Sequence, residues 1–357
     1  MSWSNCLINK EVWKYTQLLT AYRIYLKSDE SKAISSIRVL STMMIVLCHI
    51  FQGLNNELAW WFNIGVQIFL FMSGFLIANS YYKSTWEYLK KRIVRVIVPY
   101  WVFLVLVLPL YYLVGIEINI EQILIYLLGI QGFKGATPGL EHLWFISIIL
   151  VCYIIGLYMN YIRNKVVGWS EIKFWGIVIL SWIVIEIVCT PWALGYAPWF
   201  ATFTTGYFIS VRYKFKIPNI LMYILVPIVL LTTGIRVFFV YIRPIESTLF
   251  KNVFDLVYLP WSKMLLGSLL FLGMYKIFSE IYAQKDSISS IIKFLESIAY
   301  EIYLTHQVVI LGPLSLLFLT KSLIINIVII LSITIIASII INKIVNRTIR
   351  KIEFLRQ

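Results

Sequence analysis

The sequence predicts an all-α protein, a polytopic transmembrane helical bundle with about ten spans. Only 13% of its 357 residues are charged and 60% are hydrophobic, with a mean hydropathy of +0.84. Soluble domains carry about 25% charged residues, so this composition argues against a soluble enzyme, a disordered chain and a disulfide scaffold. The apolar residues also form runs of about 20, the length at which a helix crosses a bilayer core about 30 Å thick.

The apolar runs are continuous, whereas a membrane-spanning β-barrel would show alternating segments of about ten residues. In chain order, we predict spans at residues 34–54, 60–81, 96–114, 143–162, 174–190, 195–211, 218–240, 253–275, 297–318 and 322–342.

The basic residues predict the topology of these spans. If the N-terminus is cytoplasmic, 25 of the 31 Lys and Arg residues lie at the cytoplasmic face, as the positive-inside rule requires. The net charge of +14 is therefore topological and predicts no nucleic-acid partner. We expect a cytoplasmic or interfacial leader at 1–33, a transmembrane domain at 34–342 and a basic cytoplasmic tail at 343–357. The leader has no signal-peptide core.

The four cysteines are scattered without metal-ligand spacing, so we expect no disulfide and no metal site. The histidines are more informative. The chain has three, His49, His142 and His306, and all lie in predicted spans or at their ends. Ionisable residues are costly inside a bilayer, so each is a candidate for function.

The first span places two such residues on one face. Arg38 and His49 are eleven residues apart, which on a helix is three turns plus about 20° and a rise of about 16.5 Å. Ser41, Thr42 and Ile45 lie between them on the same side. An arginine that reaches the interface and a histidine bonded to a neighbour would explain each residue alone. These two explanations would not account for the alignment of Arg38 and His49 on one helix face.

Later segments supply further candidates. Arg92 and Arg95 project together from a helix and could clamp phosphate or only fix topology. The second span carries Gln67 and Gly74 on one side, a face suited to close packing.

Two more polar pairs lie at the fourth and ninth spans. Glu141 and His142, at the outer mouth of the fourth span, could be interfacial decoration or part of a proton relay near His49. In the ninth span, Tyr303 and His306 are three residues apart and share a helix face.

Five stretches together resemble the integral-membrane acyltransferase-3 proteins, which are bacterial enzymes, with animal relatives, that acylate surface glycans and other molecules. The stretches occur in the family's order and read IRVLSTMMIVLCH, GVQIFLFMSGFLI, RIVRVIVPYW, HLWFISIILVCY and YEIYLTH. One apolar stretch would be weak evidence, but five in order with a ten-span layout form a specific pattern.

The resemblance implies a multi-pass protein of the plasma membrane, expected to be a bacterial inner membrane. It implies transfer of an acyl group, usually acetyl, from cytoplasmic acetyl-CoA to a hydroxyl of a cell-surface or lipid-linked glycan. Expected partners are a glycan or glycolipid acceptor, membrane lipids and glycan-biosynthesis proteins. The candidate residues are His49, Arg38, Glu141 and His142 for catalysis, Arg92, Arg95 and Arg38 for acetyl-CoA, and Tyr303, His306 and Trp144 for the acceptor.

The sequence departs from the family pattern in two ways. The family arginine often lies near the chain start, whereas 37 residues precede Arg38. We also expect no extracytoplasmic esterase-like domain, so transfer would finish within the membrane domain or on a partner. Two alternatives stay open: a transporter or flippase for a lipid-linked saccharide, and a non-catalytic membrane subunit. A transporter would need no CoA and would tolerate the loss of His49 better than an acyltransferase.

Overall fold

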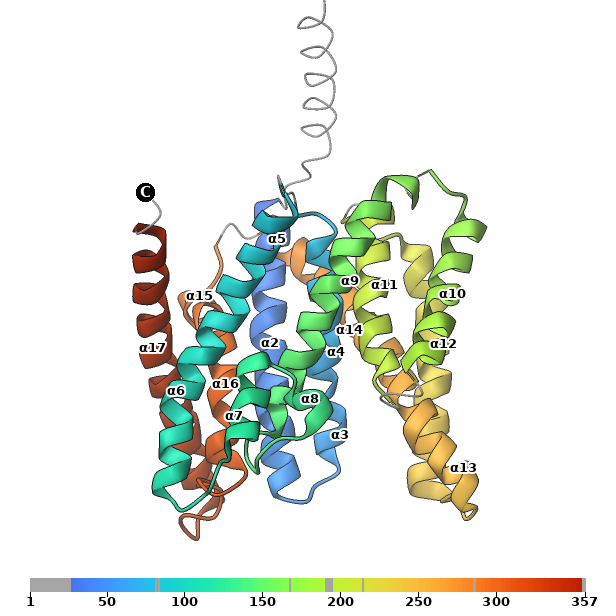
Figure 1. The fold of residues 1–357 in the computed structure, drawn as a ribbon. Helices are drawn as coiled ribbons and strands as arrows, with labels where there is room; N and C mark the ends of the chain where they lie inside the picture. Colours follow the sequence, from blue (N-terminus) through green and yellow to red (C-terminus); the bar gives the residue numbers. More distant parts are fainter. Residues whose placement is uncertain are drawn as a thin grey trace, which may run out of the picture.

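The computed structural model describes residues 27–80, 82, 84–166, 168–189, 195–213, 215–284 and 287–354 (Figure 1). The described residues contain no strand and form a bundle of helices, as the sequence predicts. Residues 1–26 of the predicted leader and 355–357 of the predicted tail lie outside the described residues.

The first half of the bundle, in chain order, consists of α2 (Ser28–Gly53), α3 (Leu58–Phe62), α4 (Ile64–Ile77), α5 (Thr85–Arg92), η1 (Ile93–Ile97), α6 (Val98–Leu113), α7 (Ile120–Leu128), α8 (Gln131–Lys134), η2 (Glu141–Leu143) and α9 (Trp144–Val166). The second half consists of α10 (Glu171–Cys189), α11 (Ala197–Tyr213), α12 (Asn219–Val237), η3 (Phe238–Ile242), α13 (Thr248–Val253), η4 (Phe254–Tyr258), α14 (Leu259–Gln284), α15 (Ser290–Ser297), α16 (Ala299–Ile310) and α17 (Leu323–Phe354).

The predicted spans largely coincide with these helices. Among the described residues, eight helical segments are long and apolar enough to cross a membrane, and they match eight of the ten predicted spans. The other two correspond to α11, with 17 residues, and α16, with 12. The predicted ninth span is too long at its end. Helix α16 stops at Ile310 because Gly312 has φ +83° and Pro313 follows.

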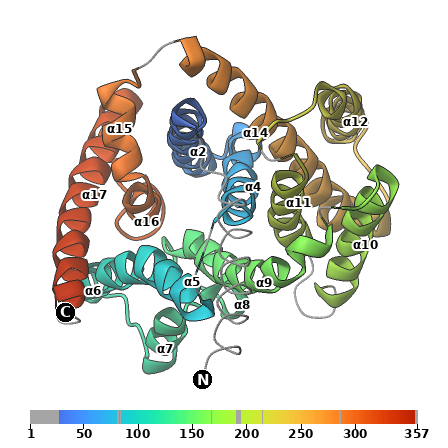
Figure 2. The same cartoon turned by 90° about the horizontal axis from the view of Figure 1, so that it is seen from above.

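Helices α2 and α4 lie at the centre of the bundle, as the view along the helices shows (Figure 2). Around them stand α16, α6, α9, α11 and α14, and helices α10, α12 and α17 lie further out. These outer helices expose many large apolar side chains, for example Ile187 at 66% and Leu230 at 67%. A lipid-facing surface explains this pattern, because lipid tails are as apolar as the side chains themselves.

The predicted packing face on the second span is confirmed. Helix α4 crosses α11 so closely that Gly74 lies against the backbone oxygen of Phe203, and Gly206 of α11 lies against that of Phe71. Buried Gln67 accepts a hydrogen bond from the Thr202 hydroxyl of the same helix α11. Small residues allow this approach, and the polar pair adds a hydrogen bond across it.

The connections predicted to be cytoplasmic gather at one end of the bundle, the upper end in Figure 1. The start of α2, helix α5, the α9–α10 and α11–α12 connections and the end of α17 all lie there. Helices α3, α7 and α13 lie toward the opposite end. Both ends of the described chain therefore lie at the same end of the bundle.

Candidate active site

Two cavities lie along the central helix α2. The larger, of about 700 Å³, lies toward the upper end, and we call it the basic cavity because Arg38, Lys91, Arg92 and Arg95 line it. The smaller, of about 300 Å³, lies toward the other end of α2 and contains His49 and His142 in its wall, so we call it the histidine cavity. Both volumes lie at or within the range of small-molecule sites, about 300–1,000 Å³.

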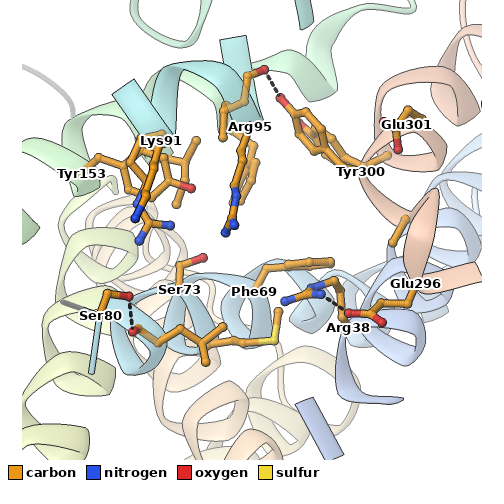
Figure 3. A pocket seen from close by; sticks show the side chains of 18 of the residues that line it. Arg38, Phe69, Ser73, Ser80, Lys91, Arg95, Tyr153, Glu296, Tyr300 and Glu301 are labelled. Carbon is orange, nitrogen blue, oxygen red and sulfur yellow. Dashed lines mark hydrogen bonds and ion pairs between the residues drawn. The ribbon is translucent and has the colours of Figure 1, made fainter. Parts of the chain in front are cut away.

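Three helical segments, α2, α5 and η1, supply the cations of the basic cavity (Figure 3). Arg38 enters from α2 and forms an ion pair with Glu296 of α15. Arg95 points in from η1 and Lys91 from α5. With Arg92, these make four cations in the wall, against the two carboxylates of Glu296 and Glu301, so the cavity is net positive.

Arg92 is held by a cage of tyrosines. Its guanidinium donates a hydrogen bond to the Tyr82 hydroxyl and lies 5.7, 5.5 and 5.3 Å from the ring centroids of Tyr82, Tyr88 and Tyr153. Its Nε atom is buried and has no hydrogen-bond partner within the described residues. The cation–π contacts and the hydroxyl hold the guanidinium in the cavity wall while leaving donor capacity for a ligand.

The backbone between the two arginines and α6 is irregular. Residues Ile93–Ile97 form a single π turn, η1, that ends just before Pro99. Within this turn the Val96 carbonyl accepts a hydrogen bond of 3.0 Å from the Tyr300 hydroxyl of α16. Such turns are frequent at functional sites. Here it sets the direction in which Arg92 and Arg95 enter the cavity.

All three histidines of the chain meet beside the histidine cavity. The His49 ring centroid lies 5.0 Å from that of His306 and 6.4 Å from that of His142, and His142 and His306 are 5.3 Å apart. His49 is half-buried and lines the cavity, whereas His306 is fully buried behind it. Although three imidazoles meet, the described residues hold no His, Cys, Asp or Glu group arranged to bind a metal ion.

Hydrogen bonds define the tautomer of each ring. His49 Nδ1 lies 3.0 Å from the Gln52 side-chain oxygen, which can only accept, so Nδ1 carries the proton. The Nε2 atom of neutral His49 therefore keeps its lone pair. His142 Nε2 and His306 Nδ1 each lie 3.0 Å from a helix carbonyl, of Leu304 and Ile302, and donate to it.

Glu141 and Trp144 lie at the rim of the histidine cavity. The Glu141 carboxylate accepts hydrogen bonds of 2.7 Å from the Gln307 side-chain amide and from the Gly139 N–H, both through Oε2. Its other oxygen accepts no hydrogen bond within the described part of the chain, and the residue lines the histidine cavity. Trp144 begins α9 next to it. A carboxylate held in this way is available to position a hydroxyl group.

The two cavities share one wall. Ile45, Phe145 and Tyr303 line both of them, with the Phe145 and Tyr303 rings 5.4 Å apart. The Tyr303 hydroxyl donates a hydrogen bond to the His142 carbonyl, which fixes its ring within the wall. A group placed in the basic cavity is thus separated from His49 by only a thin layer of side chains.

The structure therefore brings together most of the predicted site residues. Arg38 and His49 line successive cavities on one face of α2, with Ile45 between them, as their spacing predicts. Ser41 and Thr42 do not line either cavity: their hydroxyls donate to the Ile37 and Arg38 carbonyls of the same helix. The expected polar stripe is therefore interrupted, because short hydroxyl side chains in a helix are satisfied by the preceding turn.

Several residues of the site escape sequence reasoning. Glu296 pairs with Arg38, Gln52 orients His49, and Gln307 holds Glu141. Gln52 follows His49 by one turn of the same helix, so its spacing could have indicated the contact. Glu296 and Gln307 come from helices remote in sequence, and nothing in the local pattern identifies their partners.

The comparisons with known proteins agree with this geometry. The model of an acyltransferase domain, that of the acyltransferase-3 family, matches residues 31–343. The chain belongs to the acyltransferase-3 family. No curated protein and no solved structure matches it. The match includes both cavities and every residue described above, so the site lies within the family's domain.

Membership defines the general nature of this chain. An acyltransferase-3 domain with apolar helices of membrane length makes it a multi-pass membrane protein of acyltransferase type. Family membership favours an enzyme over the saccharide transporter or flippase and over the non-catalytic subunit that the sequence left open.

Proposed function

We propose that this protein is a membrane-bound O-acyltransferase that moves an acetyl group from cytoplasmic acetyl-CoA to a hydroxyl of a cell-surface or lipid-linked glycan. One observation carries the proposal: a basic cavity and a histidine cavity share a wall inside a domain of the acyltransferase-3 family. The two reactants would approach from opposite ends of the bundle and meet at that wall.

The basic cavity suits the acyl donor. Coenzyme A carries several phosphate groups, and guanidinium groups bind phosphate through paired hydrogen bonds. Arg92 and Arg95 would hold these phosphates. Arg38 lies between this pair and His49 and would contact the part of coenzyme A that carries the acyl group. The positive-inside rule predicts that this end faces the cytoplasm, where acyl-CoA is made.

The histidine cavity suits the transfer step. His49 Nε2 would take the proton of the acceptor hydroxyl as its oxygen attacks the thioester carbonyl. The tetrahedral intermediate would then collapse, the C–S bond would break, and the CoA thiolate would receive the proton from His49. His306 and His142 pack against His49 and would hold its ring in place.

The simplest test replaces His49 with alanine. We expect His49→Ala to lose acetyl transfer, because a general base contributes about 100- to 10,000-fold to such reactions. Acetyl groups on the cell-surface glycans of its host cell are counted by NMR, and CoA release by the purified protein is followed as free thiol. Met43→Ala is the matched control, since Met43 lies on the same helix and is 51% exposed.

Two results would contradict the proposal. Unchanged glycan acetylation in His49→Ala, at equal abundance in the membrane, would remove His49 from the chemistry. If the wild-type protein bound no acetyl-CoA in calorimetry, acetyl-CoA would be excluded as the acyl donor. A transporter or flippase would then be the better explanation of the structure.

A further inference from the structure

A third cavity, of about 340 Å³, adjoins the histidine cavity, and we call it the aromatic pocket. Its wall comprises three aromatic residues, Trp144, Trp199 and Tyr196, together with Gln131, Gly132, Gly135, Ala136 and Glu141. Glu141 and Trp144 belong to both this pocket and the histidine cavity. Whatever binds in the aromatic pocket is therefore next to the space that His49 faces.

The aromatic rings of the pocket are held firmly. The Trp144 and Trp199 ring centroids are 4.8 Å apart with a tilt of 55°. The Tyr196 hydroxyl donates a hydrogen bond of 2.6 Å to the Gly132 carbonyl, which ties the start of α11 to α8. Rigid rings lose little entropy on binding, so this wall is preorganised for a flat apolar surface.

Polar groups beside the aromatic rings are equally fixed. The Gly132 N–H donates to the Ser147 hydroxyl at 2.9 Å, and a side chain at Gly132 would collide with Ser147 and Trp144. The Gln131 side chain is buried and bonded to the Leu143 carbonyl at 2.6 Å. Glu141 places a carboxylate oxygen where this pocket meets the histidine cavity.

A sugar ring has the matching chemistry. Its C–H faces are apolar and stack on aromatic rings, while its hydroxyls around the edge require hydrogen-bond partners. The Glu141 Oε2 atom already accepts two hydrogen bonds, but a purely hydrophobic lipid chain would offer no donor to the second carboxylate oxygen. We propose that the aromatic pocket binds a pyranose ring of the glycan acceptor, with Glu141 accepting a hydrogen bond from the hydroxyl presented to His49.

This inference rests on the proposed function, and it names the part of the acceptor that is recognised. An aromatic pocket with a carboxylate would also suit a quaternary ammonium ion. The sugar is favoured because the pocket shares Glu141 and Trp144 with the cavity where a hydroxyl must reach His49 for transfer.

The test uses the purified full-length protein and three neutral probes: maltotriose, triacetylchitotriose and methyl α-rhamnoside. Saturation-transfer NMR measures contact between protein and sugar ring protons. We expect transfer to the ring C–H protons of at least one probe, and at least a fivefold loss in Trp199→Ala. Ala136→Trp, which fills the pocket without removing a ring, should give the same loss. Trp86→Ala is the control, because Trp86 is 65% exposed on α5 at the other end of the bundle.

Acetyl-CoA binding is measured on the same samples, and we expect it to be unchanged in Trp199→Ala and Ala136→Trp. The sugar subsite would be overturned by any of three results. These are no saturation transfer to any sugar probe, saturation transfer to tetramethylammonium alone, or saturation transfer in both pocket variants equal to that in the wild type. Sugar binding without acetyl-CoA binding in the wild type would instead overturn the acyltransferase function and leave the pocket assignment standing.

Discussion

The contact between His49 and Gln52 offers a sharp test of the catalytic geometry. Gln52 accepts the Nδ1 hydrogen of His49 at 3.0 Å and thereby leaves Nε2 free to act as a base. In Gln52→Leu this acceptor is lost, and the imidazole can adopt the other tautomer or rotate. Gln52→Glu keeps an acceptor oxygen at nearly the same place, so it should restore the orientation.

The expected size follows from the strength of the hydrogen bond. A neutral hydrogen bond contributes about 0.5–1.5 kcal/mol net, which corresponds to a factor of about 2 to 13 in population. Because Gln52 is exposed at the cavity, the lower half of that range applies. We therefore expect kcat to fall about two- to fivefold in Gln52→Leu with the KM for acetyl-CoA unchanged. Removal of His49 itself should cost at least about 100-fold.

The assay follows CoA thiol release by purified protein under saturating acetyl-CoA, with abundance and thermal stability measured in parallel. Gln284→Leu is the matched control, since Gln284 is exposed at the end of α14. An unchanged kcat in Gln52→Leu would refute the orienting role. A kcat in Gln52→Glu as low as in Gln52→Leu would show that the acceptor oxygen is not what matters.

The other two predictions concern the donor and the fold. The double variant Arg92→Gln, Arg95→Gln should weaken acetyl-CoA binding at least tenfold in calorimetry and make this binding less dependent on salt. The control Arg350→Gln, on the exposed end of α17, should change neither property. Equal affinities in the double variant and the control would mean that Arg92 and Arg95 serve only to fix topology. Gly74→Ala should lower the free energy of unfolding by about 1–3 kcal/mol and so lower the melting temperature, because the added methyl would overlap a backbone oxygen of α11. Gly176→Ala, which meets open space, should be neutral or slightly stabilising, and similar melting temperatures for the two would contradict the close packing.

The sequence predicts the membrane bundle and one face of its first helix. Hydropathy and length suffice for the spans because each must satisfy its backbone within itself and cover about 30 Å of hydrocarbon. Helical periodicity suffices to align Arg38 with His49, since residues on one helix are related by a fixed rotation and rise. The same reasoning places Gly74 on a packing face, which the structure confirms.

The helix breaks are harder to predict. Helix α16 ends eight residues before its predicted limit, and the chain between Arg92 and Pro99 contains a π turn. Hydropathy does not register such breaks, because it reports the apolar character of the residues and not the geometry of the backbone. In the π turn, the Val96 carbonyl is satisfied by Tyr300, a partner that lies far away in sequence.

The tertiary structure alone decides how the site is assembled. Three histidines from α2, η2 and α16 meet within 6.4 Å, and Glu296 neutralises Arg38 from another helix. The sequence identifies each histidine as an unusual resident of a membrane span, but the periodicity of one helix carries no information about its neighbours. Only the packing of the helices around α2 brings the basic cavity, the histidine cavity and the aromatic pocket into one continuous series.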